Sequence, residues 1–449
     1  MTNANNRSQD TSSRLSFHRL LQAGVSVGLI SVVQSVVTVV TSVILARWLG
    51  PDEFGLYSFV IGLVTLMATA GAFGLPELIL REVAVTRVDG ARGQPRLLMR
   101  KAAFLAVAIS AIVLATCWGL MKITGTLDVS VRSSAFQIGA LLLFPFVLLR
   151  LFGNVIRSCG RIVAGVFFQS LLGPLLLLIF VLIVFLADPE QLDARNTLGL
   201  RVIGTAVAGL VAAILAWRFA VVERHDKAID SPGHRPLLEM AFPFMLIGGA
   251  NIILARSDVV MIGFMMKNQD VALYTIALHG GTLVGLALLA SNMVLAPEFA
   301  RLSAYSDRHT LQHVAIGSAR IVFLTALILA ALLAAFGQGL IIFVFGAEYA
   351  PAYPALVLVA ASRAVATFFG TPGSLLNMTG HQNSYLKVLT FAMVLNVILN
   401  IILIPLWGIM GAAFSTGVCT ILLKSLSALM VQKKLDINVA AYSRARGTS

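Results

Sequence analysis

Long apolar stretches of similar length recur along the whole chain and are separated by short polar segments. An α-helix needs about 20 apolar residues to cross the hydrocarbon layer of a bilayer, and about twelve stretches reach that length with few or no internal charges. These stretches cover residues 22–45, 55–75, 102–121, 134–152, 162–187, 200–219, 239–264, 271–292, 317–345, 353–378, 386–406 and 410–430. The pattern predicts about twelve transmembrane helices joined by short hairpins.

The composition agrees with a protein that faces lipid. Hydrophobic residues make up 58% of the chain, charged residues make up only 12%, and the mean hydropathy is +0.90. A water-soluble protein of 449 residues does not need so large an apolar fraction to fill its core. We therefore expect an all-α polytopic membrane protein.

Lysine and arginine residues are distributed unequally between the two sets of loops. If the N-terminus is cytoplasmic, the inner segments hold about 25 of them and the outer loops hold about six. Cytoplasmic loops carry such an excess, so both termini are predicted to lie in the cytoplasm. The first apolar stretch is longer than a signal-peptide core and lacks an obvious small-residue cleavage site, so we expect it to remain as the first helix.

The net charge of +13 does not indicate a nucleic-acid partner. The positive residues are scattered over the inner loops and lack the interleaved aromatic residues of a nucleic-acid-binding face. Cys117, Cys159 and Cys419 stand alone in apolar or helix-end surroundings. Neither a disulfide framework nor a metal site is expected from them.

A polar segment that contains Pro and Gly follows the sixth apolar stretch and is interpreted as a linker between two halves. The predicted organisation is an N-terminal tail at 1–21, a six-helix N-terminal lobe at 22–219, a cytoplasmic linker at 220–238, a six-helix C-terminal lobe at 239–430 and a C-terminal tail at 431–449.

Two short internal matches support a duplicated six-helix unit. Glu53-Phe54-Gly55-Leu56-Tyr57-Ser58 matches Asp270-Val271-Ala272-Leu273-Tyr274-Thr275 at a spacing of about 217 residues. The segment 157–161 matches the segment 377–381 at almost the same spacing. Because six is an even number, both copies enter the membrane in the same orientation and form a parallel pseudo-repeat about an axis along the membrane normal. A central substrate cavity between the lobes is expected.

The sequence Leu-Ala-Arg-Trp-Leu-Gly-Pro-Asp-Glu-Phe-Gly-Leu-Tyr-Ser at 45–58 is followed by Gly74-Leu75-Pro76 and Arg81-Glu82. Together these residues resemble the signature of polysaccharide transporters, the Wzx-like oligosaccharide flippases of the multidrug/oligosaccharidyl-lipid/polysaccharide exporter superfamily. The resemblance continues through Asp258, the segment 346–349 and the turn at Gly380, so it covers nearly the whole chain.

This resemblance implies a function in lipopolysaccharide or exopolysaccharide biosynthesis. The implied activity moves an undecaprenyl-pyrophosphate-linked oligosaccharide from the cytoplasmic to the periplasmic leaflet of a bacterial inner membrane by alternating access. A polysaccharide polymerase or chain-length machinery is the implied class of protein partner. The Gly-Pro segment that carries the signature is itself interpreted as a helix stop and start, and not as a substrate site.

Three ionisable residues are predicted inside the membrane, where a charge costs about 2.5–3.5 kcal/mol on insertion scales. Arg363 is expected about 15 Å deep, near the midplane, and Arg256 and Asp258 about 9–12 Å from the outer end of their helix. Residues two positions apart on a helix point in directions about 200° apart, so Arg256 and Asp258 are not simple neighbours. Either the arginines provide a cationic cavity for the pyrophosphate, or Asp258 forms a buried ion pair with one of them.

Each of the other candidate polar residues has two possible interpretations. Gln34 and Asn251 lie in the middle of predicted helices, where their amides bind sugar hydroxyls or hydrogen-bond to another helix. Arg81, Arg150 and Arg157 lie at inner helix ends, where they attract the pyrophosphate from the cytoplasm or extend toward the membrane surface.

Three other functions are less consistent with these residues. A cation-coupled multidrug exporter of the same superfamily would favour acidic residues over arginines, and a lipid II flippase usually has two additional helices. A polymerase or ligase usually needs a large outer loop, whereas the longest outer segment here is about 187–200. No Walker A, His-Glu-x-x-His or Gly-x-Ser-x-Gly motif is present, so neither an enzyme nor a cofactor is expected. Protons, sodium or the membrane potential are the candidate energy sources, with Asp258 as the coupling carboxylate or as a structural partner.

Overall fold

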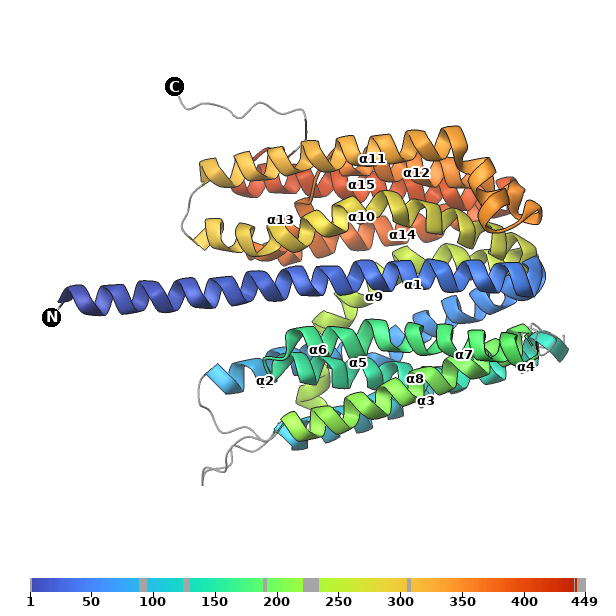
Figure 1. Ribbon diagram of the computed structural model, residues 1–449, viewed down its shortest axis with the longest axis horizontal. Coiled ribbons are helices and arrows are strands. Elements are labelled where there is room, and N and C mark those ends of the chain that lie inside the picture. Colours follow the sequence, from blue (N-terminus) through green and yellow to red (C-terminus); the bar gives the residue numbers. More distant parts are fainter. Residues whose placement is uncertain are drawn as a thin grey trace.

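The computed structural model describes residues 2–88, 95–123, 130–188, 192–220, 234–304, 308–439 and 441. Every regular element in these ranges is a helix. The helices run roughly parallel to one long axis and gather in two groups, with α1 along the middle (Figure 1). We call the group α1–α8 the N-lobe and the group α9–α15 the C-lobe.

The N-lobe comprises α1 (Thr2–Ala72), α2 (Leu75–Val88), α3 (Pro95–Ile123), α4 (Ser130–Leu141), α5 (Leu143–Ser158), α6 (Ile162–Val166), the π-helix η1 (Phe167–Leu172), α7 (Gly173–Ala187) and α8 (Ala194–Phe219). The C-lobe comprises α9 (His234–Met265), α10 (Asn268–Ala304), α11 (Arg308–Val344), the 3-10 helix η3 (Ala347–Ala352), α12 (Tyr353–Thr367), α13 (Pro372–Met378), α14 (Gln382–Trp407) and α15 (Ile409–Leu435).

The prediction of an all-α polytopic membrane protein is confirmed. Ten helical stretches in the described part of the chain are long and apolar enough to cross a membrane. The first of them, Ser26–Ala72, is 47 residues long and contains two of the predicted stretches, 22–45 and 55–75. The predicted stretch 271–292 lies within α10, which is 37 residues long. The remaining predicted stretches each coincide with one of the ten.

Helix α1 reverses direction at Gly50 and therefore forms a hairpin of two arms. Gly50 has φ 72° and ψ 173°, a conformation that glycine adopts without the steric cost that a Cβ would add. Pro51 follows at the start of the second arm, where its missing N–H removes no helical hydrogen bond. A break at Phe73 and Gly74, with φ 48° and 71°, separates α1 from α2, which continues toward the same end of the bundle (Figure 1). We call the two ends of the bundle the Gly50 end and the Gly74 end.

Several predicted boundaries differ from the structure. Helix α1 begins at Thr2 and α9 at His234, so helix replaces part of the predicted tail and linker. Hydropathy marks only the part of a helix that contacts hydrocarbon, and a helix can continue beyond it. Residues 76–88 lie between two predicted stretches, and in the structure they belong to α2. The predicted stretch 353–378 is broken around Gly370, which has φ 65°, into α12 and α13.

The lobes share a hydrophobic core only over part of their length. At the Gly50 end, Leu45 and Phe54 of α1 belong to the same cluster of buried residues as Phe345 and Tyr349 of the C-lobe. Toward the Gly74 end, the C-lobe contains two further clusters, one around Leu375 and one around Leu389, and none of their described members belongs to the N-lobe. The lobes are thus joined at the Gly50 end. Toward the Gly74 end, the start of α9 still packs on the N-lobe through Leu237 and Ala241, whereas the rest of the C-lobe has separate cores.

Glycine contacts line the packing of the α1 second arm against the C-lobe. A Cβ on Gly55 would lie 1.8 Å from the carbonyl oxygen of Asn268, and a Cβ on Gly263 would lie 2.1 Å from the ring of Phe59. Gly62 faces the side chains of Val259 and Val260. Small residues let helix backbones approach closely, as they do in membrane helix pairs. We call this row of contacts the glycine seam.

Candidate substrate site

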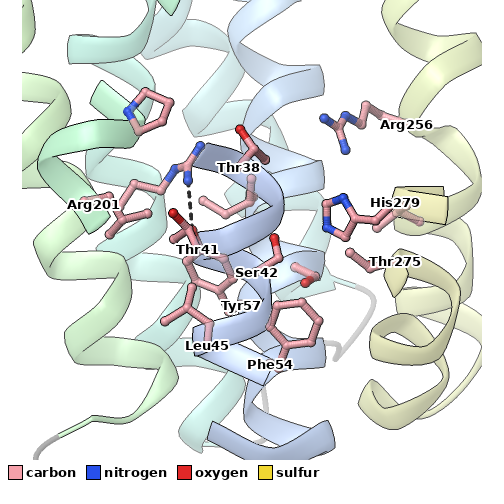
Figure 2. A pocket seen from close by; sticks show the side chains of 15 residues that line it. Thr38, Thr41, Ser42, Leu45, Phe54, Tyr57, Arg201, Arg256, Thr275 and His279 are labelled. Carbon is pink, nitrogen blue, oxygen red and sulfur yellow. Dashed lines mark hydrogen bonds between the residues drawn. The ribbon is translucent and has the colours of Figure 1, made fainter. Parts of the chain in front are cut away.

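A pocket lies between the lobes, on the Gly50 side of the bundle (Figure 2). Both arms of α1 contribute to it, together with α7 and α8 of the N-lobe and α9 and α10 of the C-lobe. Its lining residues are Thr38, Thr41, Ser42, Leu45, Phe54, Tyr57, Ser58, Ile61, Pro174, Leu177, Arg201, Arg256, Val259, Thr275 and His279. The cavity volume of about 110 Å³ holds several water molecules but no oligosaccharide.

Two arginines reach this pocket from opposite lobes. Arg201 comes from α8 and Arg256 from α9, and Figure 2 shows them on opposite sides of the α1 helices. Arg201 donates a hydrogen bond of 2.9 Å to the Tyr57 hydroxyl. Arg256 lies close enough to Arg201 for the two charges to repel each other. The pocket is therefore a cationic site to which both lobes contribute.

Neutral polar groups surround these charges. The Thr38 and Thr41 hydroxyls donate to backbone carbonyls one turn earlier in their own helix, at 2.8 and 2.7 Å. The Nε2 atom of His279 is buried without a hydrogen-bond partner, and the histidine ring lies on the same side of the pocket as Arg256 (Figure 2). A ligand with both negative charge and hydroxyl groups has complementary partners here.

Asp258 lies outside the pocket lining and is 1% exposed. Its Oδ2 atom accepts hydrogen bonds from the Tyr274 hydroxyl and, at 2.7 Å, from the Thr416 hydroxyl. Within the described part of the chain, its Oδ1 atom is buried without a hydrogen-bond partner, and Asp258 forms no ion pair with Arg256 or Arg363. Both arginines nevertheless lie near enough for their charges to attract it. The opposed directions expected for Arg256 and Asp258 agree with one side chain in the pocket and the other in the C-lobe.

Further polar side chains extend the Asp258 cluster within the C-lobe. Ser257 donates to Asn396 Oδ1 at 2.9 Å, and Asn396 Nδ2 lies 3.2 Å from Ser415 Oγ. Asn400 donates to Asn396 Oδ1 at 3.2 Å, and its own Oδ1 atom is buried without a partner. Buried polar groups normally have partners, and two oxygens of this cluster, Asp258 Oδ1 and Asn400 Oδ1, have none among the described residues.

Arg363 lies in the C-lobe and not in the pocket lining. A Cβ on Gly281 would lie 3.1 Å from its Nε atom, and a Cβ on Gly285 would lie 3.5 Å from its Nη1 atom. The arginine therefore crosses α10 at two glycines one turn apart. Lys424 on α15 lies near enough for its charge and that of Arg363 to repel. Lys424 lies within the candidate span Ile409–Leu435.

The other membrane candidates make bonds within their own helices. Asn251 is exposed and donates to the Ile247 carbonyl at 2.8 Å. Gln34 is half-buried, and its backbone carbonyl accepts the Thr38 bond. Neither residue lines the pocket, and neither of these bonds joins two helices.

The three candidates for the cytoplasmic approach lie near the Gly74 end in different surroundings. Arg81 is exposed on α2. Arg150 forms an ion pair of 3.0 Å with Glu77, the acidic residue in the first turn of α2. Arg157 donates to Asn154 at 3.0 Å, and its Nε atom is buried without a partner. Arg81 is thus the most accessible of the three charges.

Sequence analysis missed Arg201, Tyr57 and His279 as pocket residues. Arg201 lies next to residue 200, where the sequence predicted the helix to begin, so it was counted among the basic residues of the outer loops. The helix begins earlier, at Ala194, and Arg201 therefore lies about two turns inside α8. The described residues contain no group of three His, Cys, Asp or Glu side chains able to hold a metal ion.

Comparisons with known proteins identify the family. Residues 20–303 match the family described as polysaccharide biosynthesis protein. A probable low-salt glycan biosynthesis flippase, Agl15 of Haloferax volcanii, is 25% identical over 236 residues, which are 52% of this chain and 48% of the flippase. An uncharacterized membrane protein of Methanocaldococcus jannaschii is 37% identical over 99 residues, 21% of this chain and 20% of that protein. The chain thus spans about half the length, or less, of these curated relatives.

Solved structures share the fold over almost the whole chain. An inward-facing multidrug resistance transporter of the MATE family has a TM-score of 0.68 and 14% identity, with 90% of this chain and 94% of that chain covered. The lipid II flippase MurJ in an inward closed conformation has a TM-score of 0.71 and 12% identity, with 90% and 87% covered. At these identities the likeness establishes the fold and not the substrate.

Proposed function

Since the chain belongs to the polysaccharide biosynthesis protein family, we propose that it moves a lipid-linked oligosaccharide across a membrane. The proposed cargo is an undecaprenyl-pyrophosphate-linked repeat unit of the O-antigen or exopolysaccharide type. The proposed direction is from the cytoplasmic to the periplasmic leaflet of a bacterial inner membrane, with both termini in the cytoplasm. The Gly50 end is then periplasmic and the Gly74 end cytoplasmic.

The observation that carries this proposal is the pair of arginines that line one pocket from the two lobes. A pyrophosphate is a dense anion that loses its hydration when it leaves water, and fixed guanidinium groups replace that hydration with charge-assisted hydrogen bonds. Arg201 and Arg256 are placed to do so together, because their charges face the same space. A cationic drug would instead be repelled from this pocket.

The separate cores at the Gly74 end favour a state that is open toward the cytoplasm. In alternating access, the two lobes rock about a fixed central site. The present pocket is too small for an oligosaccharide. The sugar must therefore enter after a further separation of the lobes, while the polyprenyl tail stays in lipid.

Asp258 is the proposed coupling residue. Among the described residues, no arginine lies within ion-pair distance of this buried carboxylate. It is therefore costly as an anion and favours a bound proton or a small cation. The unpartnered oxygens of Asp258 and Asn400 support such a role. The energy source is then a proton or sodium gradient, and a polysaccharide polymerase is the proposed consumer of the exported repeat unit.

The test replaces both pocket arginines with alanine and measures surface polysaccharide together with the accumulated lipid-linked repeat unit. We expect export to stop while membrane insertion and protein abundance stay normal. The double lysine variant retains the charge and should restore part of the export. Arg195→Ala is the matched control, because Arg195 is an exposed arginine near the same end of α8.

Two further measurements separate the alternatives. A multidrug exporter would change the tolerance of cells to cationic drugs, and that tolerance should not respond to the arginine variants. A lipid II flippase would rescue cells depleted of their own lipid II flippase. Normal export by the double alanine variant would refute the pocket assignment.

A further inference from the structure

The turn between the two α1 arms is fastened to the C-lobe by the side chain of Arg47. Arg47 Nε donates to the carbonyl oxygen of Val344 at 2.7 Å, and Nη2 donates to that of Phe343. Both carbonyls belong to the last turn of α11. Carbonyls in the last turn of a helix lack intrahelical partners and carry the negative end of the helix dipole. The guanidinium therefore binds a site that suits a cation.

Two further hydrogen bonds fasten the same turn to the C-lobe. The Tyr349 hydroxyl of η3 donates to the carbonyl oxygen of Ala46 at 2.8 Å. Gln269 at the start of α10 donates to Asp52 Oδ2 at 2.7 Å. The turn is thus held by three separate C-lobe elements, α11, η3 and α10. We call Arg47, Asp52, Gln269 and Tyr349 the latch.

The latch lies at the pseudo-twofold axis of the fold. Asp52 and Gln269 are 217 residues apart, the same spacing that relates the two sequence repeats. Equivalent positions in two copies can contact each other only near the axis that relates the copies. The latch is therefore placed where a rocking motion of the lobes opens or closes the Gly50 end.

The pocket lies directly behind the latch along α1. Leu45 and Phe54 line the pocket, and each is within two positions of a latch residue in the sequence. The ring of Phe54 also contacts that of Tyr349, with centroids 6.5 Å apart. A change in the latch is therefore transmitted to the pocket wall by direct contact.

Burial differs among the latch residues in a way that suits a reversible closure. Tyr349 is 1% exposed, whereas Arg47, Asp52 and Gln269 are exposed. Water can replace the bonds of the exposed residues when they separate, so each bond stabilises the closed state only modestly. Several modest bonds close the turn firmly without making its release prohibitively slow.

We propose that this latch is the outer gate of the transporter and that its release opens the pocket at the Gly50 end. Arg47 is the principal closing residue, because it alone makes two bonds across the lobes. Tyr349 closes the gate from the buried side, and the Asp52–Gln269 bond closes it from the exposed side. Arg47 and Asp52, which do not line the pocket, thereby acquire a role in gating that is separate from substrate binding.

The experiment measures access to the pocket and does not need the substrate. In a chain without Cys117, Cys159 and Cys419, Ser42→Cys places one thiol in the pocket wall. A membrane-impermeant thiol reagent is added to intact cells and, separately, to inverted membrane vesicles. We expect slow labelling when the reagent reaches the Gly50 end, which in the proposed orientation is the outer face of intact cells. Arg47→Ala should accelerate it roughly five- to thirtyfold, the ratio expected when bonds of one to two kcal/mol are lost.

Two variants guard against a folding defect. Tyr349→Phe keeps the ring and removes only the bond to Ala46, so it should accelerate labelling by a smaller factor. Arg195→Ala, at the same end of the bundle but outside the latch, should leave the labelling rate unchanged. Unchanged labelling with both Arg47→Ala and Tyr349→Phe would overturn the proposal. Because this readout is independent of cargo, it separates failure of the gate from failure of the proposed function.

Discussion

Tyr57 in the N-lobe and Tyr274 in the C-lobe occupy equivalent positions of the two sequence repeats but bind opposite charges. The Tyr57 hydroxyl accepts a hydrogen bond from Arg201 beside the pocket. The Tyr274 hydroxyl donates to Asp258 inside the C-lobe. One copy thus binds a cation beside the pocket, and the other binds a carboxylate inside the C-lobe. The tyrosine is therefore the same in both repeats, but the charge that it binds differs.

The neighbouring positions explain how one fold accommodates both arrangements. At the same spacing of about 217 residues, the pocket residue Thr41 corresponds to Asp258, and Val64 corresponds to Gly281. Gly281 leaves space beside α10 for Arg363, whereas Val64 is buried in an apolar core. The lack of a side chain at Gly281 on α10 thus makes room for the buried charge of Arg363. The N-lobe offers no such space, so its cation lies at the pocket surface.

The largest expected effect follows from Asp258→Asn. The amide keeps the size of the carboxyl group and can accept the Tyr274 and Thr416 hydrogen bonds, so the chain should still fold. It cannot bind a proton or hold the charge of a cation, so export should fall by at least about tenfold, within the usual range of coupling free energies. The measurement is the accumulated lipid-linked repeat unit, with and without an ionophore. Normal export that still responds to the ionophore would show that Asp258 is not the coupling group.

The next effect tests the space beside Arg363. Gly281→Val gives the C-lobe the residue that the N-lobe has at the equivalent position. The new Cβ would lie 2.4 Å from Val359 Cγ1 and 3.1 Å from Arg363 Nε. Overpacking of this kind costs about 1–3 kcal/mol, so the thermal unfolding temperature in detergent should fall.

Gly317→Ala on α11 is the control for this substitution, since nothing lies within 4 Å of its Cβ position. Its unfolding temperature should stay the same or rise slightly, because alanine favours the helix over glycine. Equal unfolding temperatures for Gly281→Val and the parent chain would mean that Arg363 does not need a glycine at position 281.

The difference between the two tyrosine variants is the smallest expected effect. Tyr274→Phe removes a bond to a buried carboxylate, which is expected to cost about 1.5–3 kcal/mol of unfolding free energy. Tyr57→Phe removes a bond to a half-buried arginine that water can replace, so its cost should be about 0.5–1.5 kcal/mol. Denaturation of the two variants in the same detergent gives the comparison. A larger loss of unfolding free energy for Tyr57→Phe than for Tyr274→Phe would contradict the assignment of Tyr274 as the structural tyrosine and Tyr57 as the pocket tyrosine.

Hydrophobic patterning predicted the helices well because each transmembrane stretch must satisfy its own backbone and cover its own lipid contacts. Helix geometry alone also predicted that Arg256 and Asp258 point in different directions. The break around Gly370 was not predicted, because the apolar run continues through it. Helix α2 was missed for the converse reason, since it lies beyond the apolar run.

Partners from distant parts of the chain could not be predicted from the sequence. Asp258 bonds to Thr416, 158 positions away, and Arg47 to Val344, 297 positions away. Such contacts depend on helix packing, which leaves no local pattern in the sequence. The equivalent tyrosines were visible as a sequence match, but their opposite partners were not, because Arg201 and Asp258 come from helices outside the matched segments.

The glycine seam sets the kind of motion that the two lobes can make. Gly55, Gly62 and Gly263 present little side-chain bulk between the α1 second arm and its neighbours. Phe59 packs against Gly263, and Val259 and Val260 pack against Gly62, so the helices lie closer together here than two rows of larger side chains would allow. A close contact of this kind keeps the distance between the lobes fixed along the seam. Relative motion of the lobes is therefore a rotation about the seam, and the spacing between them changes most at the surfaces farthest from it.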